Sequence, residues 1–316
     1  MSVAPSTFAF ADLWEAISAS VPNRTALVSA EHRLSFAELN DRAARLAGWM
    51  KEQGVGPGTY VGVQMRNRAE HVEAMLAAYK LRAIPVNINY RLGPAELHYL
   101  YSDCGLVGVL HDEGMGADVA AAVRDVVAVR FTLEAGEAYE HALTAAPVAP
   151  IARSSDDVYA LYTGGTTGNP KSVEWRMEDA FFACLGGGDP TAERGAVAHP
   201  KELVERILAD RAFLPAAPLV HAAGMWTTLR WLARAAKKSE RDYRSPKKTE
   251  RRFQNKLRHE ITLLHRALHA RHGRPIRRTF LRGTCAKNSM RRAPAGRKNA
   301  KYLTIKLLEA DASQLS

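Results

Sequence analysis

Residues 35–64 read SFAELNDRAARLAGWMKEQGVGPGTYVGVQ, a stretch that predicts a helix followed by a buried strand. Ser35 and Glu38 have the spacing of a capping box, which would start the helix. Apolar residues then recur at helical spacing, at Leu39, Ala43, Leu46, Ala47 and Met50. A glycine-rich turn closes the helix, and Tyr-Val-Gly-Val-Gln at 60–64 has the composition of a strand. We therefore expect one helix–strand unit of an α/β fold.

The same alternation continues along the chain. Helical patterns near 69–81 and 95–102 each precede an apolar, strand-like run, at 84–88 and 106–110 respectively. In the first of these helices four residues are expected to face inward: Val72, Met75, Leu76 and Tyr79. Near-continuous apolar strands separated by helices are typical of a parallel sheet covered by helices. The predicted fold class is α/β, with layered, largely parallel sheets flanked by helices.

Charge divides the chain into two unlike parts. Residues 1–233 carry 20 Lys and Arg against 27 Asp and Glu, a net charge of −7, whereas residues 234–316 carry 24 against 6, a net charge of +18. Dense like charge opposes the burial of a core. We expect a folded part over 1–233 and a basic, poorly ordered tail over 234–316, which we interpret as a frameshifted or fused end. The tail has one apolar helical face, at Leu257, Ile261, Leu264 and Leu268.

Several other classes of protein fit the sequence poorly. Cys104, Cys184 and Cys285 are odd in number and far apart, so they predict buried free thiols rather than a disulfide framework or a CxxC metal site. The N-terminus lacks the pattern of a signal peptide, and no apolar run has the length of a membrane span. We therefore expect a cytoplasmic protein with no metal site formed by its own side chains.

A glycine-rich loop is the strongest chemical signal. Leu-Tyr-Thr-Gly-Gly-Thr-Thr-Gly-Asn-Pro-Lys-Ser at 161–172 places glycines, which let a backbone approach an anion, beside the donors Thr166, Thr167 and Lys171. Pro170 separates the last glycine from the lysine, so the motif is not a Walker loop. The alternating residues that follow predict a strand, which makes the loop a connection between strands. We interpret it as a polyphosphate-binding loop; the alternative is a hairpin turn without a ligand.

This loop resembles the signature loop of the adenylate-forming enzymes, which include acyl-CoA synthetases, luciferases and the adenylation domains of peptide synthetases. The residues just after it, from Trp175 to Asp189, look like the continuation found in bacterial fatty-acid and steroid-side-chain CoA ligases. Three further blocks are similar to the same family: LSFAEL at 34–39, YKLRAIPVNINYRL at 79–92 and PAAPLVHAAGMW at 215–226. The resemblance covers most of residues 8–233 and implies the N-terminal part of an adenylate-forming domain.

The resemblance implies an acid–thiol ligase of fatty-acid metabolism that activates a fatty or steroid-side-chain carboxylic acid. In such enzymes the carboxylate attacks the α-phosphate of MgATP to give acyl-adenylate and pyrophosphate, and CoA then takes the acyl group. ATP, Mg²⁺ and CoA are therefore implied, with no specific nucleic-acid partner. The residues implied to hold the phosphates are Thr163, Gly164, Gly165, Thr166, Thr167, Gly168 and Lys171.

The resemblance also places His221, Met225 and Trp226 beside the acyl-adenylate. Taken alone, a histidine in an apolar stretch is more often a structural residue, and a Met-Trp pair is more often part of a core. Gly186 to Gly188 are interpreted as a helix C-cap and turn, because three glycines without a phosphate-facing strand and helix are weak evidence for nucleotide binding.

Two departures from the family lead us to expect that this truncated chain is inactive. Ser172 replaces the glycine that usually follows the loop lysine, and at a positive φ it would add strain of about 1 kcal/mol or more. After residue 233 the family's Tyr-Gly-x-Thr-Glu and Thr-Gly-Asp motifs and its lysine-bearing C-terminal domain are not recognisable. Each lost electrostatic contact costs about 10²- to 10³-fold in rate, so the loss of several together should leave no useful turnover. We therefore assign no catalytic residue.

Two alternatives of other classes stay open. The chain could be a non-catalytic, ATP-binding remnant of a ligase, in which case ATP would bind without turnover. It could also bind polyanions such as nucleic acid or anionic membranes through its tail, although a segment of such charge binds polyanions nonspecifically whatever its origin.

The division at residue 233 can be tested with trypsin. Cleavage should remove the tail first and leave a fragment ending between about residues 230 and 260, because few apolar groups there offset an ordering cost of about 1 to 2 kcal/mol per residue. Intact-mass measurement after brief digestion identifies the fragments. Early cuts at Arg66, Lys80 or Arg82 beside an intact tail would show that the tail is a folded domain.

Overall fold

A computed structural model describes residues 6–29, 32–163, 170–189, 195–206, 212–213, 217–233 and 237–238. Its helices are α1 Phe10–Ser20, α2 Phe36–Glu52, α3 Ala69–Lys80, α4 Pro94–Cys104, α5 Gly116–Val123, α6 Glu137–Ala142, α7 Met177–Ala183, α8 Glu202–Glu205 and α9 Ala222–Leu232. Its strands are β1 Thr25–Val28, β2 Arg33–Ser35, β3 Tyr60–Gln64, β4 Ile84–Asn87, β5 Gly108–His111, β6 Phe131–Glu134, β7 Val158–Thr163, β8 Lys171–Arg176, β9 Ala212–Phe213 and β10 Lys237–Lys238. The apolar face predicted over 257–268 and Cys285 lie outside the described residues.

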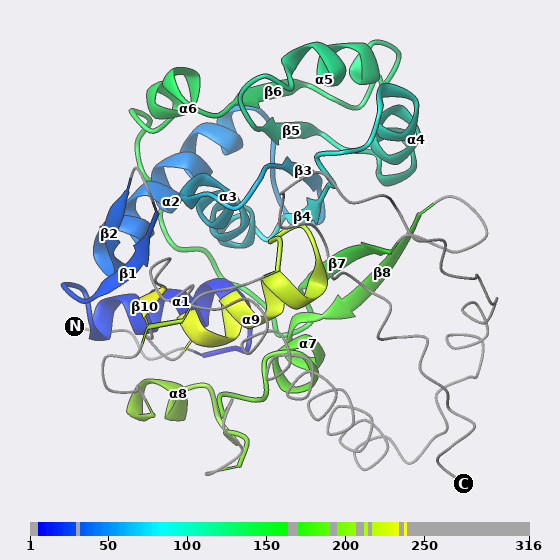
Figure 1. The fold of residues 1–316 in the computed structure, drawn as a ribbon. Helices are drawn as coiled ribbons and strands as arrows, with labels where there is room; N and C mark the ends of the chain where they lie inside the picture. Colours follow the sequence, from blue (N-terminus) through cyan, green and yellow to red (C-terminus); the bar gives the residue numbers. More distant parts are fainter. Residues whose placement is uncertain are drawn as a thin grey trace, which may run out of the picture. The chain divides into compact units, whose positions relative to one another are not determined.

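A parallel four-stranded sheet forms the centre of the N-terminal part, in the order β4-β3-β5-β6 (Figure 1). Val86 and Val109 stand opposite Gly62 of β3 and join a core cluster with residues of α4 and α5. The side chains of Val61 and Val63 point to the other face, because residues alternate along a strand. There α3 packs on β3 and β4. The predicted fold class, a largely parallel sheet between helices, is confirmed.

The first predicted unit forms as expected. Ser35 Oγ accepts the backbone N–H of Glu38 at 3.1 Å, and a carboxylate oxygen of Glu38 accepts the N–H of Ser35 at 2.7 Å. This capping box satisfies two of the N–H groups that the first turn of α2 leaves without helical partners. The hydrogen-bonded start fixes where α2 begins, and β3 follows it at the predicted residues.

Helix α3 differs from the prediction in how completely it is buried. The sequence predicts one inward face, yet all twelve residues of α3 are buried, including Glu70, His71, Glu73 and Lys80. The reason is packing: α1, α2 and the sheet strands β3 and β4 all contact α3. A buried charge is costly unless it is paired and hydrogen-bonded, so each of these polar side chains must find partners in the surrounding elements.

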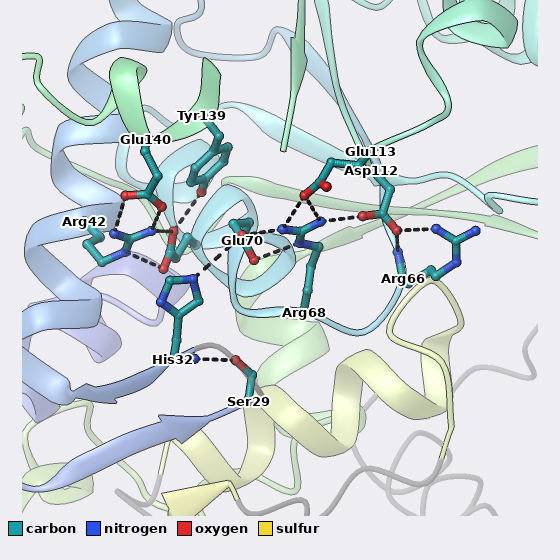
Figure 2. A network of polar contacts seen from close by, with 11 residues as sticks. Ser29, His32, Arg42, Arg66, Arg68, Glu70, Asp112, Glu113, Tyr139 and Glu140 are labelled. Carbon is teal, nitrogen blue, oxygen red and sulfur yellow. Dashed lines mark hydrogen bonds and ion pairs between the residues drawn. The ribbon is translucent and has the colours of Figure 1, made fainter. Parts of the chain in front are cut away.

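Arg42 of α2 provides one such set of partners (Figure 2). Its guanidinium donates to Glu73 at 2.7 Å and to Glu140 of α6 at 2.6 Å. The hydroxyl of Tyr139 donates to Glu73 at 2.9 Å. Burial raises the pKa of Glu73 above its ordinary value even though Arg42 and Tyr139 oppose that shift. These contacts tie α2, α3 and α6 into one unit.

A second set of ion pairs surrounds Arg68, just before α3 (Figure 2). Arg68 pairs with Glu70 at 2.6 Å and with Asp112, which follows β5, at 2.6 Å. Arg66 donates to the other oxygen of Asp112 at 2.9 Å. Burial alone would raise the pKa of Asp112, but Arg68 and Arg66 together lower it. The ends of β3 and β5 are therefore linked at the carboxyl edge of the sheet.

The C-terminal end of α3 carries a strained residue. Arg82 has a φ of +58°, which lies in the left-handed region that glycine usually occupies. Among the described residues it is the one residue other than glycine with a positive φ. Its guanidinium donates to both carboxylate oxygens of Asp157, with one contact at 2.7 Å. Asp157 directly precedes β7, so this bidentate pair fixes the start of β7 against the end of α3.

Two further expectations can be compared with the described residues. Cys104 and Cys184 are buried free thiols, as predicted, and burial raises the pKa of each to about 12. Within the described ranges, no helix combines the length and the apolar character needed to cross a bilayer.

Replacing Arg82 separates its strain from its ion pair. Arg82→Ala and Arg82→Gly both lose the contact with Asp157, but only glycine relieves the left-handed strain, so the Gly variant should be the more stable by about 1 kcal/mol. Urea unfolding at constant m-value gives the difference. Arg45→Ala, which removes an exposed pair with Asp41, is the control and should change stability by less than about 0.5 kcal/mol. Equal stability of the Ala and Gly variants would contradict strain at Arg82.

Candidate active site

An antiparallel hairpin carries the glycine-rich loop. β7 and β8 pair from Val158 opposite Arg176 to Thr163 opposite Lys171. The predicted strand after the loop is therefore confirmed, and the loop joins two strands rather than opening a helix. Gly164, Gly165, Thr166, Thr167 and Gly168 lie outside the described residues, and so does the side chain of Thr163. What the hairpin does establish is that the two ends of the loop stand side by side.

Lys171 begins β8 with an exposed side chain. Ser172 follows in extended strand conformation and is not at positive φ, so the strain considered for this serine does not arise. The reason is its place in the ladder, where it pairs with Tyr162.

Tyrosine hydroxyls fasten this hairpin to the sheet and to α4. Tyr162 of β7 donates to Asp103 at 2.8 Å, and Tyr60 of β3 donates to Glu174 of β8. Burial and the neighbouring acidic groups raise the pKa of both phenols above the ordinary value, so they remain donors at neutral pH. The hydroxyl of Tyr99 also reaches the carbonyl oxygen of Pro170 at 3.4 Å. The base of the loop is thus held on both strands.

The segment with His221 forms the second half of the candidate site. His221 is the N-cap residue of α9, and its own N–H donates to Pro218 O at 3.1 Å. Burial lowers the pKa of His221 below the ordinary histidine value, and the positive charge of Arg91 lowers it further. The ring is therefore neutral at physiological pH and can accept a hydrogen bond.

The other two residues predicted here lie in the first turns of α9. Met225 is buried, with 1% of its surface exposed, whereas Trp226 is half-buried. The indole N–H of Trp226 donates to the hydroxyl of Tyr159, a fully buried residue of β7, at 3.1 Å. This bond connects α9 directly to the hairpin that carries the loop. Their place beside an acyl group stays a prediction.

Two asparagines belong to this region although the sequence analysis does not single them out. Asn87 ends β4, and Asn67 follows β3, so both lie at the carboxyl edge of the parallel sheet. Each hydrogen-bonds to the backbone of Leu219, two residues before His221. A polar residue at the carboxyl end of a predicted parallel strand is the signal that could have identified them, since ligands bind at that edge in open α/β sheets.

The run Gly186 to Gly188 follows α7 as a turn. α7 ends at Ala183, and all three glycines have positive φ values. The N–H of Gly187 returns to Phe181 O at 3.0 Å, which closes the turn after the helix. The predicted turn is confirmed, but the predicted C-cap is wrong: Cys184 caps α7, and the glycines follow it as the turn.

In the described ranges no three His, Cys, Asp or Glu side chains gather as a metal-binding group. Magnesium in nucleotide sites is commonly held by one or two carboxylates together with the phosphates of the substrate. The implied Mg²⁺ is therefore assigned no ligands among the described residues.

Comparison with known proteins gives the family. A family model described as AMP-binding enzyme matches residues 14–265. The 3-oxocholest-4-en-26-oate–CoA ligase of Rhodococcus rhodochrous is 38% identical over 232 residues, which are 68% of this chain and 42% of that protein. A medium/long-chain-fatty-acid–CoA/3-oxocholest-4-en-26-oate–CoA ligase of Mycobacterium marinum is 35% identical over 71% of this chain and 44% of that protein. The chain thus spans less than half the length of these relatives.

Solved structures agree on the fold. A fatty acyl CoA synthetase of Mycobacterium tuberculosis superposes with a TM-score of 0.62 at 22% identity, over 73% of this chain and 44% of that one. ATP-bound MatB of Rhodopseudomonas palustris gives a TM-score of 0.61 at 24% identity, over 72% and 45%. The boundary expected at residue 233 stays a prediction. Since the family model covers well over half of its residues, the chain belongs to the AMP-binding enzyme family.

Proposed function

We propose that these residues build the N-terminal part of a site that activates a carboxylic acid with ATP, first to acyl-adenylate and then to acyl-CoA. The observation that carries the proposal is the β7–β8 hairpin, which brings Lys171 and Thr163 together at the ends of a Gly/Thr-rich loop. Family enzymes use ATP and CoA as substrates, and the names of the relatives point to fatty or steroid-side-chain acids as the carboxylate class.

The chain's contribution to the first step is charge stabilisation and positioning. A carboxylate oxygen attacks the α-phosphorus, the bond from that phosphorus to the bridging oxygen breaks, and pyrophosphate leaves with the electron pair. Lys171, with the hydroxyls and amides of Thr163 to Gly168, would hold the charge of the β- and γ-phosphates and of the leaving group. Mg²⁺, when bound with ATP, would neutralise part of the same charge. Neutral His221 would lie beside the acyl-adenylate as a hydrogen-bond acceptor.

We infer further that the 316-residue polypeptide by itself does not turn over. Residues 234–316 contain none of the motifs that the family resemblance assigns to adenine, magnesium and ribose binding. Several contacts would be lost together, and each is worth about 10²- to 10³-fold in rate. Two other proposals rest on the sequence alone: the chain binds ATP without catalysis, or its basic tail binds polyanions nonspecifically.

Lys171 provides the direct test of phosphate binding. Lys171→Ala should weaken binding of MgATP about tenfold to a hundredfold, since a hydrogen bond to a charged group contributes about 1.5 to 3 kcal/mol. Titration calorimetry measures the affinity, with Lys171→Arg as the charge-conserving variant. Lys51→Ala, at the exposed end of α2, is the matched control and should bind like the wild type. Equal ATP affinity of wild type and Lys171→Ala would remove the loop from the site.

Turnover is tested separately by pyrophosphate exchange. The purified polypeptide with ATP, fatty or steroid acids and CoA should show no carboxylate-dependent exchange and no acyl-CoA. Exchange that depends on the carboxylate and disappears in Lys171→Ala would overturn the inference of inactivity and support a complete adenylation site in this chain. Exchange that persists in the variant would come from elsewhere and contradict the assigned role of Lys171.

A further inference from the structure

The backbone N–H and the backbone carbonyl oxygen of one residue, Leu219, are each hydrogen-bonded to an asparagine side chain. The N–H of Leu219 donates to Asn67 Oδ1 at 2.7 Å, and Asn87 Nδ2 donates to the carbonyl oxygen of Leu219 at 3.1 Å. Asn67 Nδ2 also donates to Ala217 O at 3.3 Å. The two asparagines lie at or just after the carboxyl ends of neighbouring parallel strands. Residues 217–219 are therefore hydrogen-bonded to the carboxyl edge of the sheet.

The orientation of the Asn87 amide is fixed from within the core. Its side chain is buried, with 5% of the residue exposed, and His71 Nε2 lies 3.3 Å from its oxygen. The other ring nitrogen of His71 lies 3.2 Å from Met65 O, and a neutral ring carries one N–H, which donates to one of these two oxygens. With its oxygen beside His71, the amide presents its NH₂ group to Leu219. Leaving either buried group without a partner costs about 1 to 3 kcal/mol, so the arrangement resists rotation.

The Leu219 peptide in turn sets the backbone of His221. The N–H of His221 donates to Pro218 O, and the N–H of Met225 donates to His221 O at 3.0 Å, which starts α9. Gly224 packs so closely on the preceding turn that a Cβ atom there would collide with Pro218 O. A shift of the 217–219 segment would therefore move the histidine with it.

We propose that Asn67 and Asn87 are positioning residues for His221, fixing its distance from the carboxyl edge of the sheet. The proposal rests on the proposed function in that His221 acts beside the acyl-adenylate. The asparagines act through the backbone of Leu219. If the asparagines only stabilised the fold, replacing them would lower the free energy of unfolding without changing the surroundings of the His221 ring.

The first experiment reads the His221 ring directly. NMR titration of the full chain, with the resonance among its eleven histidines assigned through His221→Gln, follows the pKa. The wild-type value should lie below that of an ordinary histidine, and Asn87→Leu or Asn67→Leu should raise it toward the ordinary value, because a displaced ring is more hydrated and farther from Arg91. An unchanged His221 titration in both variants would overturn the proposal.

Two aspartate variants sharpen the test, because aspartate nearly keeps the shape of asparagine. Both aspartates add a negative charge that by itself raises the pKa of His221. Asn67→Asp keeps the oxygen that accepts the Leu219 N–H and loses only the weaker contact with Ala217 O, so it should shift the His221 titration less than Asn87→Asp. Asn87→Asp replaces the donor that faces the Leu219 carbonyl by an acceptor, so it should disturb His221 strongly. Equal effects of the two substitutions would contradict hydrogen bonding to Leu219 as the cause. Asn67 is exposed, so its variants remain informative if the Asn87 variants fail to fold.

Asn40→Leu is the matched control, because Asn40 accepts hydrogen bonds from Trp14 at 3.1 Å and Lys80 at 2.8 Å, away from His221. It should lower stability and leave the His221 titration unchanged; a shift as large as that of Asn87→Leu would reduce the asparagines to a general stabilising role and overturn the proposal.

A second readout uses a non-hydrolysable acyl-sulfamoyl adenosine and calorimetry. Asn87→Leu should bind it about tenfold more weakly than the wild type, and Asn40→Leu equally well. The wild type should bind the analogue weakly, because residues 234–316 lack the motifs that the family resemblance assigns to adenine and ribose. No binding at all would contradict the proposed function, while the His221 titration would still decide the positioning role. Wild-type affinity in Asn87→Leu would contradict the positioning role alone.

Discussion

The burial of α3 on every side is the constraint on which the rest of the described structure depends. Glu70, His71, Glu73 and Lys80 of this helix are all buried, so the helix is stable only if each of these side chains finds a polar partner. Lys80 pairs with Glu15 of α1 at 2.7 Å, and Arg153 pairs with the same carboxylate. Burial alone would raise the pKa of Glu15, but the two cations lower it below its ordinary value. The packing of α1 and α2, and of the chain before β7, follows from these pairings.

The same helix links the two halves of the candidate site. At its end, Arg82 reaches Asp157 and fixes the start of the hairpin that carries the glycine-rich loop. From its middle, His71 supports Asn87, which holds the segment before His221. The hydrogen bond from Trp226 to Tyr159 links α9 to the hairpin. The parts that we propose to bind phosphate and to contact the acyl-adenylate thus pack on one buried helix.

The sequence predicts the elements whose signals are local. The capping box of α2, the alternation of helix and strand through β5 and the hairpin around the loop can be recognised from neighbouring residues alone. The sequence analysis does not predict α1, although its apolar residues follow helical spacing. It also does not predict β6, in which only Phe131 and Leu133 are buried. The complete burial of α3 and the grip on Leu219 could not be predicted, because they join residues up to 152 positions apart. Such contacts follow from tertiary packing and not from any pattern along the chain.

The order of strands in the central sheet has a consequence for synthesis of the chain. β3, β4, β5 and β6 pair only among themselves within that sheet, and β6 ends at Glu134. The sheet and the helices between its strands are therefore available for folding once this residue has left the ribosome, before the hairpin and His221 emerge. Chain elongation at about 5 to 20 residues per second then separates the two events by several seconds. The hairpin and the segment with His221 then pack onto a scaffold whose carboxyl edge already exists.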